Sequence, residues 1–414
     1  MASRTPSKQK KSRWTAVAPA LESRNFRLFW IAQIISVTGT SLQVIAESYL
    51  IYEITDSAFW LGAVGFIALI PVVPISLVGG VLIDRVPRRK LIIVTQTGLF
   101  LQAIIFALLT ISGNIQLWQM ILLYFVFGAL LAIDHPARRA FLVDIVDREN
   151  LSNAVALNAT IFNISNLIGF AIGGLLIAAV GVGITMVINA LTYIFPIIAL
   201  ATIKVVDVAQ DSKKGGFGVA LSEGFVAVWR QPAILGTMAL MAVVGGLAYP
   251  ATGLMAAYAA EVMAVGAVGL GILLSSAALG AVIGTVIVAR LGAHQKGRNL
   301  IIAALILPLL IIAVAFAPNM VTACLALIAL GGMLLILQSL AVTIVQLHIE
   351  DRVRGRVMTI YSMLHAGADT GSNMVVGALA VPLGLSTALV VAGVVAWVFA
   401  VGLNLFMPAI RKMD

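Results

Sequence analysis

The stretch Gly80-Val81-Leu82-Ile83-Asp84-Arg85-Val86-Pro87-Arg88-Arg89 decides the fold, because it is a short charged segment between two long apolar runs. The runs on either side, 57–81 and 91–112, contain no charged residue. Each is long enough to cross the hydrocarbon core of a bilayer as a helix, which takes about 20 residues. The stretch is therefore predicted to be a loop that joins two membrane-spanning helices at one membrane surface.

The rest of the chain continues this pattern. Of its 414 residues 61% are hydrophobic and 10% are charged, whereas soluble domains are about 45–50% apolar and about 25% charged. This composition excludes a soluble enzyme, a disordered chain and a disulfide scaffold, and the single cysteine, Cys324, has no partner for an internal disulfide. We predict an all-α membrane protein whose twelve transmembrane helices lie at 29–54, 57–81, 91–112, 117–134, 154–179, 183–203, 233–257, 265–289, 300–317, 320–345, 357–382 and 386–408.

The positions of the basic residues predict the topology. All 26 Lys and Arg residues lie before the first span, in loops that follow even-numbered spans, or after the last span. Because basic residues accumulate on the cytoplasmic side, both termini and these loops are predicted to be cytoplasmic in a multi-pass protein of the cell membrane. The net charge of +9 then faces anionic lipid headgroups, which excludes a nucleic-acid-binding role.

The sequence also repeats itself at half its length. At one constant offset Gly62-Ala63-Val64-Gly65 matches Gly266-Ala267-Val268-Gly269, and Gly173 matches Gly377. Two parallel six-helix halves with a substrate site between them are a transporter architecture. The predicted organisation is a basic cytoplasmic tail (1–28), an N-terminal bundle (29–203), a cytoplasmic linker (204–232), a C-terminal bundle (233–408) and a second cytoplasmic tail (409–414).

The linker contains a periodic apolar segment. Phe217, Leu221, Phe225 and Trp229 recur at every fourth position. This spacing predicts an amphipathic helix that lies on the inner surface of the membrane.

The loop after the second span, Gly80 to Arg89, resembles the signature of the major facilitator superfamily, G-x-L-x-D-R-x-G-R-R, with Pro87 in place of a glycine. Three further segments are similar to the branch that holds enterobactin exporters and macrolide efflux proteins: Arg24-Asn25-Phe26-Arg27, Tyr52-Glu53-Ile54-Thr55-Asp56-Ser57 and Pro136-Ala137-Arg138-Arg139-Ala140. The resemblance implies the major facilitator fold and an efflux transporter that works by alternating access.

Two positions depart from the antiporters of that superfamily. The fifth span has Phe170 where the antiporter pattern has proline, and the fourth span lacks the intramembrane arginine of many drug–proton antiporters. A facilitator or importer without proton coupling therefore remains an alternative.

The signature loop predicts a gate. The Asp84 carboxylate, at a helix end, is expected to bind neighbouring arginines or the free N–H groups of an adjacent helix, and so to close the cytoplasmic side in one state. The alternative is that the arginines only fix the topology. The gate residues that we single out are Gly80, Asp84, Arg85, Arg88 and Arg89, together with Asp134 and Arg138, one turn apart at the inner end of the fourth span.

Only two carboxylates, Glu47 and Asp369, lie well inside spans. A charged residue at a helix centre costs about 2.5–3.5 kcal/mol on insertion scales, so we expect both to be functional. Each belongs to a polar stripe predicted to line the central cavity: Gln33, Ser36, Thr40, Gln43 and Glu47 in the first span, and Ser362, His365, Asp369 and Asn373 in the eleventh. The alternative for both stripes is hydrogen bonding between helices.

Burial in a low-dielectric cavity disfavours a charged carboxylate, which suits a proton-coupling group. Glu47 and Asp369 are therefore the candidates for proton coupling, with His365, one turn before Asp369, as a group that shares the proton. Asn158, Ser165 and Asn166 of the fifth span are further candidates for the cavity wall.

The sequence contains no Walker-type glycine loop, no cluster of His and Cys for a metal and no nucleophile triad, so we expect no cofactor, no metal and no enzymatic activity. We predict a monomeric secondary transporter that exports small amphipathic molecules in exchange for protons and is surrounded by membrane lipids. The alternatives are the uncoupled facilitator or importer and a lipid translocase of the same fold.

Overall fold

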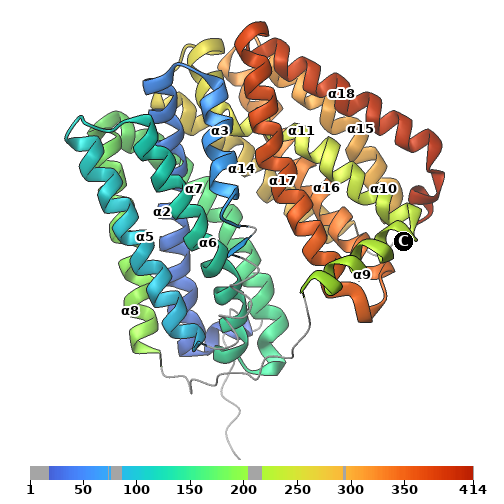
Figure 1. Ribbon diagram of the computed structural model, residues 1–414, viewed down its shortest axis with the longest axis horizontal. Helices are drawn as coiled ribbons and strands as arrows, with labels where there is room; N and C mark the ends of the chain where they lie inside the picture. The colour runs from blue at the N-terminus through green and yellow to red at the C-terminus, as the bar shows by residue number, and fades with distance from the viewer. Residues whose placement is uncertain (1–17, 73, 76–85, 204–216, 292–294, 414) are drawn as a thin grey trace, which may run out of the picture.

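The computed structural model describes residues 18–72, 74–75, 86–203, 217–291 and 295–413, and within this part it is almost entirely helical, with no strand. Figure 1 shows two helical halves side by side, the N-terminal half in blue to green and the C-terminal half in yellow-green to red. The fold class predicted from the composition is confirmed.

The N-terminal half begins with the short helix η1 (Pro19–Glu22) and contains another, η2 (Arg148–Asn150). Its long elements are α2 (Arg24–Thr55), α3 (Ala58–Leu69), α5 (Arg88–Ile111), α6 (Leu117–Ile145), α7 (Leu151–Thr192) and α8 (Ile194–Thr202). The helix α9 (Phe217–Trp229) lies between the halves in sequence.

The C-terminal half begins with an interrupted helix made of α10 (Pro232–Leu240), η3 (Met241–Gly245), α11 (Gly246–Ala248), α12 (Pro250–Gly253), α13 (Met255–Ala257) and η4 (Tyr258–Val262). It continues with α14 (Ala267–Arg290), α15 (Lys296–Ala315), α16 (Met320–His348), α17 (Asp351–Leu383), α18 (Leu385–Phe406) and η5 (Pro408–Lys412).

The described part of every predicted span is helical, but the boundaries differ: α7 contains the fifth span and part of the sixth, and the seventh is interrupted. Within the described residues, nine helices are long and apolar enough to cross a membrane, and one of them, Arg148–Thr202, runs through two predicted spans. The second span is described as the shorter α3, and α17 is less apolar because it carries the charged residues at its start and the polar stripe. Many large apolar side chains on the outside of the bundle are exposed, as expected where lipid covers a protein.

Three of the predicted breaks between spans contain a glycine with a positive φ angle. Gly113, Gly181 and Gly384 have φ values of 70°, 82° and 78°, a region that residues with a side chain rarely adopt. Gly181 divides α7 into two antiparallel spans. Asn319 caps the start of α16, and its side chain accepts a hydrogen bond of 3.0 Å from the N–H of Thr322. These breaks place the basic residues that the structure describes at one end of the molecule, the basic end, and Ser112, Gly181 and Gly384 at the opposite end.

The two halves touch near the opposite end through α7 against α14 and α3 against α17. A Cβ atom on Gly174 would lie 2.6 Å from the carbonyl oxygen of Ala267, and one on Gly377 would lie 2.6 Å from that of Ala58. The tyrosine hydroxyl of Tyr52 donates a 3.0 Å hydrogen bond to Glu261 across the same boundary. The opposite end is therefore closed.

The first helix of the C-terminal half is irregular in its middle. Its π-helical turns are η3 and η4, and Pro250 begins α12, with only Tyr249 between it and the end of α11. Proline has no N–H to offer the carbonyl group four residues earlier, that of Gly246. The hydroxyl of Ser372 on α17 donates to this carbonyl oxygen at 2.6 Å instead. The break thus brings α11 and α12 against α17, where the polar stripe lies.

Candidate functional site

A cavity of about 470 Å³ lies between the two halves and is called the central cavity here. Its N-terminal wall comes from α2 and α7, and its C-terminal wall comes from Tyr249, which lies between α11 and α12, and from α12, α14, α16 and α17. Most lining residues are apolar, and the polar groups are Asn163, Asn166, Tyr249, Thr252, Gln338, His365 and Asp369. A mainly apolar cavity with a few convergent polar groups is the usual form of a small-molecule site.

The C-terminal wall holds a chain of hydrogen bonds. The amide of Gln338 donates to the hydroxyl of Tyr249, which lies 3.3 Å from Nε2 of His365. Asp369 follows His365 by one helical turn, and its Oδ1 accepts a 3.1 Å hydrogen bond from the amide of Asn373. Among the described residues Asp369 forms no ion pair with a lysine or arginine.

The N-terminal wall carries two amides of α7. Oδ1 of Asn166 accepts a 2.7 Å hydrogen bond from the hydroxyl of Ser41 on α2, and the amide of Asn163 donates to Thr285 of α14 at 3.3 Å. Two phenylalanines, Phe162 and Phe170, line the same wall. This wall therefore combines aromatic rings with amides that bridge neighbouring helices.

Two further cavities lie on the side of this site that faces the basic end. A vestibule of about 540 Å³ between the halves is lined by His135, Arg139 and Ser362, among others. A side cavity of about 490 Å³ in the N-terminal half is lined by Gln33 and Asn158, shares Arg139 with the vestibule and shares Phe162 with the central cavity. Among the described residues, contacts close the opposite end, and the free space between the halves continues towards the basic end.

The polar stripe of α2 lies elsewhere than predicted. The prediction that it lines the central cavity is wrong for Ser36, Gln43 and Glu47, which are buried inside the N-terminal half. Glu47 is 1% exposed, and its Oε1 accepts a 2.8 Å hydrogen bond from Gln43. The same glutamine binds Gln102 of α5 and Asn189 of α7 at 3.1 and 2.7 Å.

The physical reason is that three helices of one half present polar groups to each other, so the stripe is satisfied within the half. Ser36 donates to Gln96 of α5 at 3.4 Å, and Thr40 lies 3.3 Å from the hydroxyl of Tyr193. Of this stripe, Gln33 borders the side cavity. The alternative interpretation, hydrogen bonding between helices, describes this stripe.

The predicted pair of Asp134 and Arg138 is present. Nε of Arg138 lies 2.5 Å from Oδ2 of Asp134, and its guanidinium also donates to Gln33. Oδ1 of Asp134 accepts hydrogen bonds of 2.7 Å from Thr95 and 2.9 Å from Gln96. The pair thus ties α6 to α5 and α2 inside the N-terminal half.

The arginines at the start of α5 also bind within this half. Arg88 forms an ion pair of 2.7 Å with Asp144 of α6, and Arg89 donates to the carbonyl oxygens of Leu200 and Ala201 at the end of α8, at 2.6 and 2.9 Å. Gly80, Asp84 and Arg85 lie outside the described residues. Neither Arg88 nor Arg89 bonds to a described residue of the C-terminal half in this conformation.

The remaining candidates fall into three places. Asn166, His365 and Asp369 line the central cavity, and Asn158 and Ser362 line the neighbouring cavities. Ser165 is buried, and its hydroxyl donates to the carbonyl oxygen of Ile34 at 3.3 Å, so the prediction that it lines the cavity is wrong. Asn373 supports Asp369 from the next turn.

The sequence interpretation missed Asn163, Tyr249 and Gln338. Gln338 is the only amide in the apolar span 320–345, and Asn163 lies one turn before Asn166. Both signals were available from the sequence. The position of Tyr249 follows from the break at Pro250, which hydropathy alone does not reveal.

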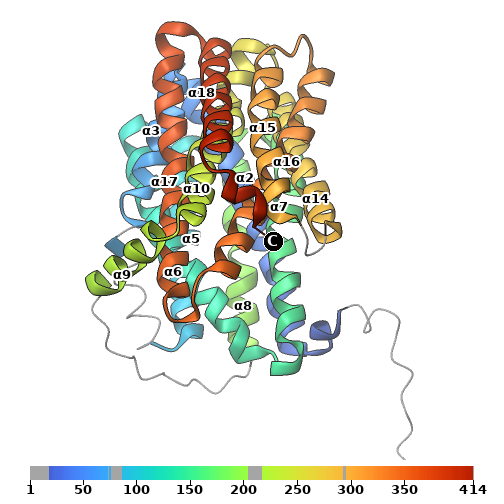
Figure 2. The same ribbon diagram turned by 90° about the vertical axis from the view of Figure 1, so that its right-hand side faces the viewer.

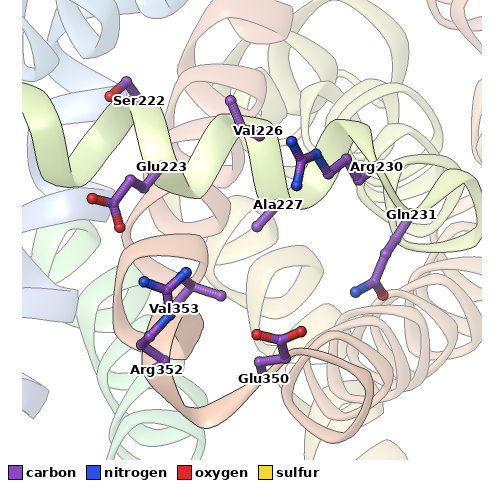
Figure 3. Close-up of a pocket in the computed structure, with 9 residues that line it drawn as sticks. All are labelled: Ser222, Glu223, Val226, Ala227, Arg230, Gln231, Glu350, Arg352 and Val353. Atoms are coloured by element: carbon purple, nitrogen blue, oxygen red, sulfur yellow. The ribbon is translucent and has the colours of Figure 1, made fainter.

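A separate pocket of about 350 Å³ lies at the basic end between α9 and the start of α17, next to residues of both charge signs (Figure 3). Figures 1 and 2 show α9 lying obliquely beside the start of α17. The guanidinium of Arg356 pairs with Glu223 across this contact. These groups attach α9 to the C-terminal half, away from the central cavity.

Comparisons with known proteins agree with this geometry. The family model described as MFS_3, transmembrane secretion effector, matches residues 14–414. The enterobactin exporter EntS of Salmonella typhimurium is 24% identical over 364 residues, which cover 86% of this chain and 85% of that protein. The staphyloferrin A transporter of Staphylococcus aureus is 26% identical over 191 residues, which cover 45% of this chain and 48% of that protein. The chain therefore matches about half of the length of that transporter. The macrolide efflux protein A of Streptococcus pyogenes is 22% identical over 44% of both chains.

Two solved structures share the fold. The nucleoside transporter NupG has a TM-score of 0.73 at 12% identity and covers 94% of this chain and 100% of that chain. A bacterial homologue of the human lysosomal transporter Spinster, in an inward-facing and unoccupied conformation, has a TM-score of 0.71 at 14% identity, with 94% and 97% covered.

Proposed function

Because this chain belongs to the transmembrane secretion effector family of major facilitator transporters, we propose that it exports small amphipathic molecules in exchange for protons. It is a membrane transporter and not an enzyme. The observation that carries the proposal is the central cavity, which lies between the two halves, opens towards the basic end and contains one carboxylate, that of Asp369.

The direction of transport rests on the placement of charge. If the basic end faces the cytoplasm, as the positive-inside rule predicts, both termini are cytoplasmic and the site collects its substrate from the cytoplasm. Substrate then leaves when the opposite end opens. Relatives named as exporters of enterobactin and as a macrolide efflux protein support this direction.

The exposed side chains of α9 agree with an orientation in which the basic end faces the cytoplasm. Phe225 and Trp229 are 56% and 76% exposed on one face of this helix, while Gly224 and Val228 on the other face are buried. Apolar aromatic side chains beside a cation such as Arg230 are favourable at the lipid headgroup level. We place α9 at the cytoplasmic membrane surface, where its apolar face enters the lipid.

The amphipathic character of the substrate follows from the two walls of the cavity. Phe162, Phe170 and the aliphatic residues of α14 and α16 offer apolar surface, while Asn166 and Gln338 offer hydrogen bonds. A molecule with one polar and one apolar part satisfies both.

Proton coupling is assigned to Asp369 in preference to Glu47. Asp369 lines the cavity that holds the substrate, so a proton and a substrate meet at the same group. Glu47 is enclosed in the N-terminal half, with Oε1 bonded to Gln43 and Oε2 without a hydrogen-bond partner. It remains the second candidate, because a change in its protonation would act through packing between helices.

The proposal is tested by transport in proteoliposomes with an acidic lumen. The full chain is reconstituted, and uptake is measured for a panel of amphipathic compounds that lack a titratable amine, because weak bases accumulate in acidic vesicles without a transporter. We expect at least one compound to accumulate against its gradient, and a protonophore to abolish the accumulation. Protein-free vesicles are the control.

Other outcomes identify the alternatives. Equal uptake with and without the pH gradient would indicate an uncoupled facilitator. Movement of a fluorescent phospholipid between leaflets, in the absence of uptake of any panel compound, would indicate a lipid translocase.

A further inference from the structure

We propose that the central cavity selects amphipathic cations over anions of the same shape and that Asp369 provides the counter-charge. This inference rests on the proposed function, because it names the substrate class of the same site. It begins from the charges of the wall: among the described residues that line the central cavity, Asp369 is the only carboxylate and there is no lysine or arginine.

The Asp369 carboxylate is available for a ligand. Among the described residues, its one side-chain hydrogen-bond partner is the neutral amide of Asn373, at 3.1 Å. Asp369 is half-buried, and a carboxylate that is partly removed from water is usually paired with a cation or receives several hydrogen bonds. A cationic ligand in the cavity supplies the missing partner, whereas an anionic ligand adds a second negative charge beside it.

Aromatic rings in the wall favour the same charge. Phe162 and Phe170 line the cavity from α7, and Tyr249 lines it from the opposite half. The face of an aromatic ring attracts a cation that lies within about 6 Å of its centre, and repels an anion. Rings on both walls therefore offer apolar surface to the substituents of a ligand, and they add to the preference of the cavity for a cation.

The positive groups nearby do not reverse this preference. Arg138 is neutralised by Asp134 at 2.5 Å. Arg139 is exposed and lines the vestibule and the side cavity, where water screens its charge. The ring of His365 already has a hydrogen-bonding partner within the wall, because its Nε2 lies 3.3 Å from the hydroxyl of Tyr249. Of the three cavities, the central cavity is thus the one lined, among the described residues, by a carboxylate and by no arginine.

The test uses two probes that differ in charge and hardly in shape, tetraphenylphosphonium and tetraphenylborate. Equilibrium binding of each is measured to the purified full chain in lipid nanodiscs, with empty nanodiscs as the background. We expect the wild-type protein to bind the phosphonium at least about tenfold more tightly than the borate, which corresponds to about 1.4 kcal/mol.

The variant Asp369→Asn is expected to lose at least about tenfold in phosphonium affinity and to change borate affinity by less than about twofold. Asp351→Asn is the matched control, because this aspartate is on the same helix and its side chain is 86% exposed. It is expected to bind both probes as the wild type does. The charge preference of the wild-type protein tests the inference even if Asp369→Asn does not fold.

Equal affinity of the wild type for the two probes, or tighter binding of the borate, would overturn the inference. So would an Asp369→Asn protein that is folded and keeps the full preference. Because binding is measured without a gradient, these results are distinct from a failure of the proposed function. If the protein binds the phosphonium but moves no compound under a pH gradient, the inference of a cation site stands and the proposed export function is refuted.

Discussion

Replacement of Gly174 by valine is expected to slow transport at least about tenfold, because it prevents the two halves from closing at the opposite end. A Cβ atom at this position would lie 2.6 Å from the carbonyl oxygen of Ala267 and 2.9 Å from Cα of Gly271. Both are backbone atoms of the opposite half, so neither can turn away as a flexible side chain does. The two helices must separate to admit the larger residue.

The effect is specific to one conformation. The contact forms in the state that is open towards the basic end, so the substitution disfavours this state and leaves the other unaffected. Overpacking a close contact costs about 1–3 kcal/mol, and about 1.4 kcal/mol changes an equilibrium constant tenfold. We expect a lower initial rate of transport, together with greater labelling of a cysteine introduced at Asn166 from the Ser112 side of the membrane.

Gly402→Val provides the control. Gly402 lies in α18, and a Cβ atom there would meet nothing within 4 Å. This variant is expected to transport at the wild-type rate. Wild-type transport by Gly174→Val would show that closing α7 against α14 is not part of the cycle.

Replacement of Asp134 by alanine is expected to have the largest effect on stability. The side chain is 1% exposed, and it receives Arg138 and the hydrogen bonds of Thr95 and Gln96. Removing one partner of a buried ion pair costs about 3–5 kcal/mol, because the other charge stays buried without compensation. The midpoint of thermal unfolding in detergent is therefore expected to fall by many degrees.

The exposed pair of Asp351 and Arg354 is the matched comparison. Its side chains are 86% and 44% exposed, and exposed ion pairs contribute about 0–1 kcal/mol. Asp351→Ala should leave the unfolding midpoint almost unchanged. If Asp134→Ala is as stable as Asp351→Ala, the cluster around Arg138 does not hold α6 to α5 and α2.

The sequence predicts much of this fold, because hydropathy and the positions of charges act over whole helices. The breaks at Gly113, Gly181 and Gly384 and the pair of Asp134 with Arg138 follow from local rules: glycine tolerates a positive φ, and residues one turn apart meet on a helix.

Such rules do not predict which neighbouring helices the polar stripe of α2 packs against. A helical period shows that Ser36, Gln43 and Glu47 share a side of their helix, but it does not show which neighbour that side meets. The decision depends on Gln96, Gln102 and Asn189 of other helices, which accept or donate the matching hydrogen bonds. On α17 the equivalent stripe has fewer partners and borders the cavity at His365 and Asp369.

The central claim is that Asp369 exchanges a proton for substrate in the central cavity. The most direct measurement is pH-driven accumulation of one neutral compound from the panel by the wild type, Asp369→Asn and Glu47→Gln in matched proteoliposomes. We expect Asp369→Asn to lose accumulation against the gradient while it still equilibrates the compound down its gradient, because the amide cannot release a proton. Glu47→Gln is expected to retain accumulation. Accumulation by Asp369→Asn at the wild-type level would contradict the claim, and its loss in Glu47→Gln alone would move the coupling to the N-terminal half.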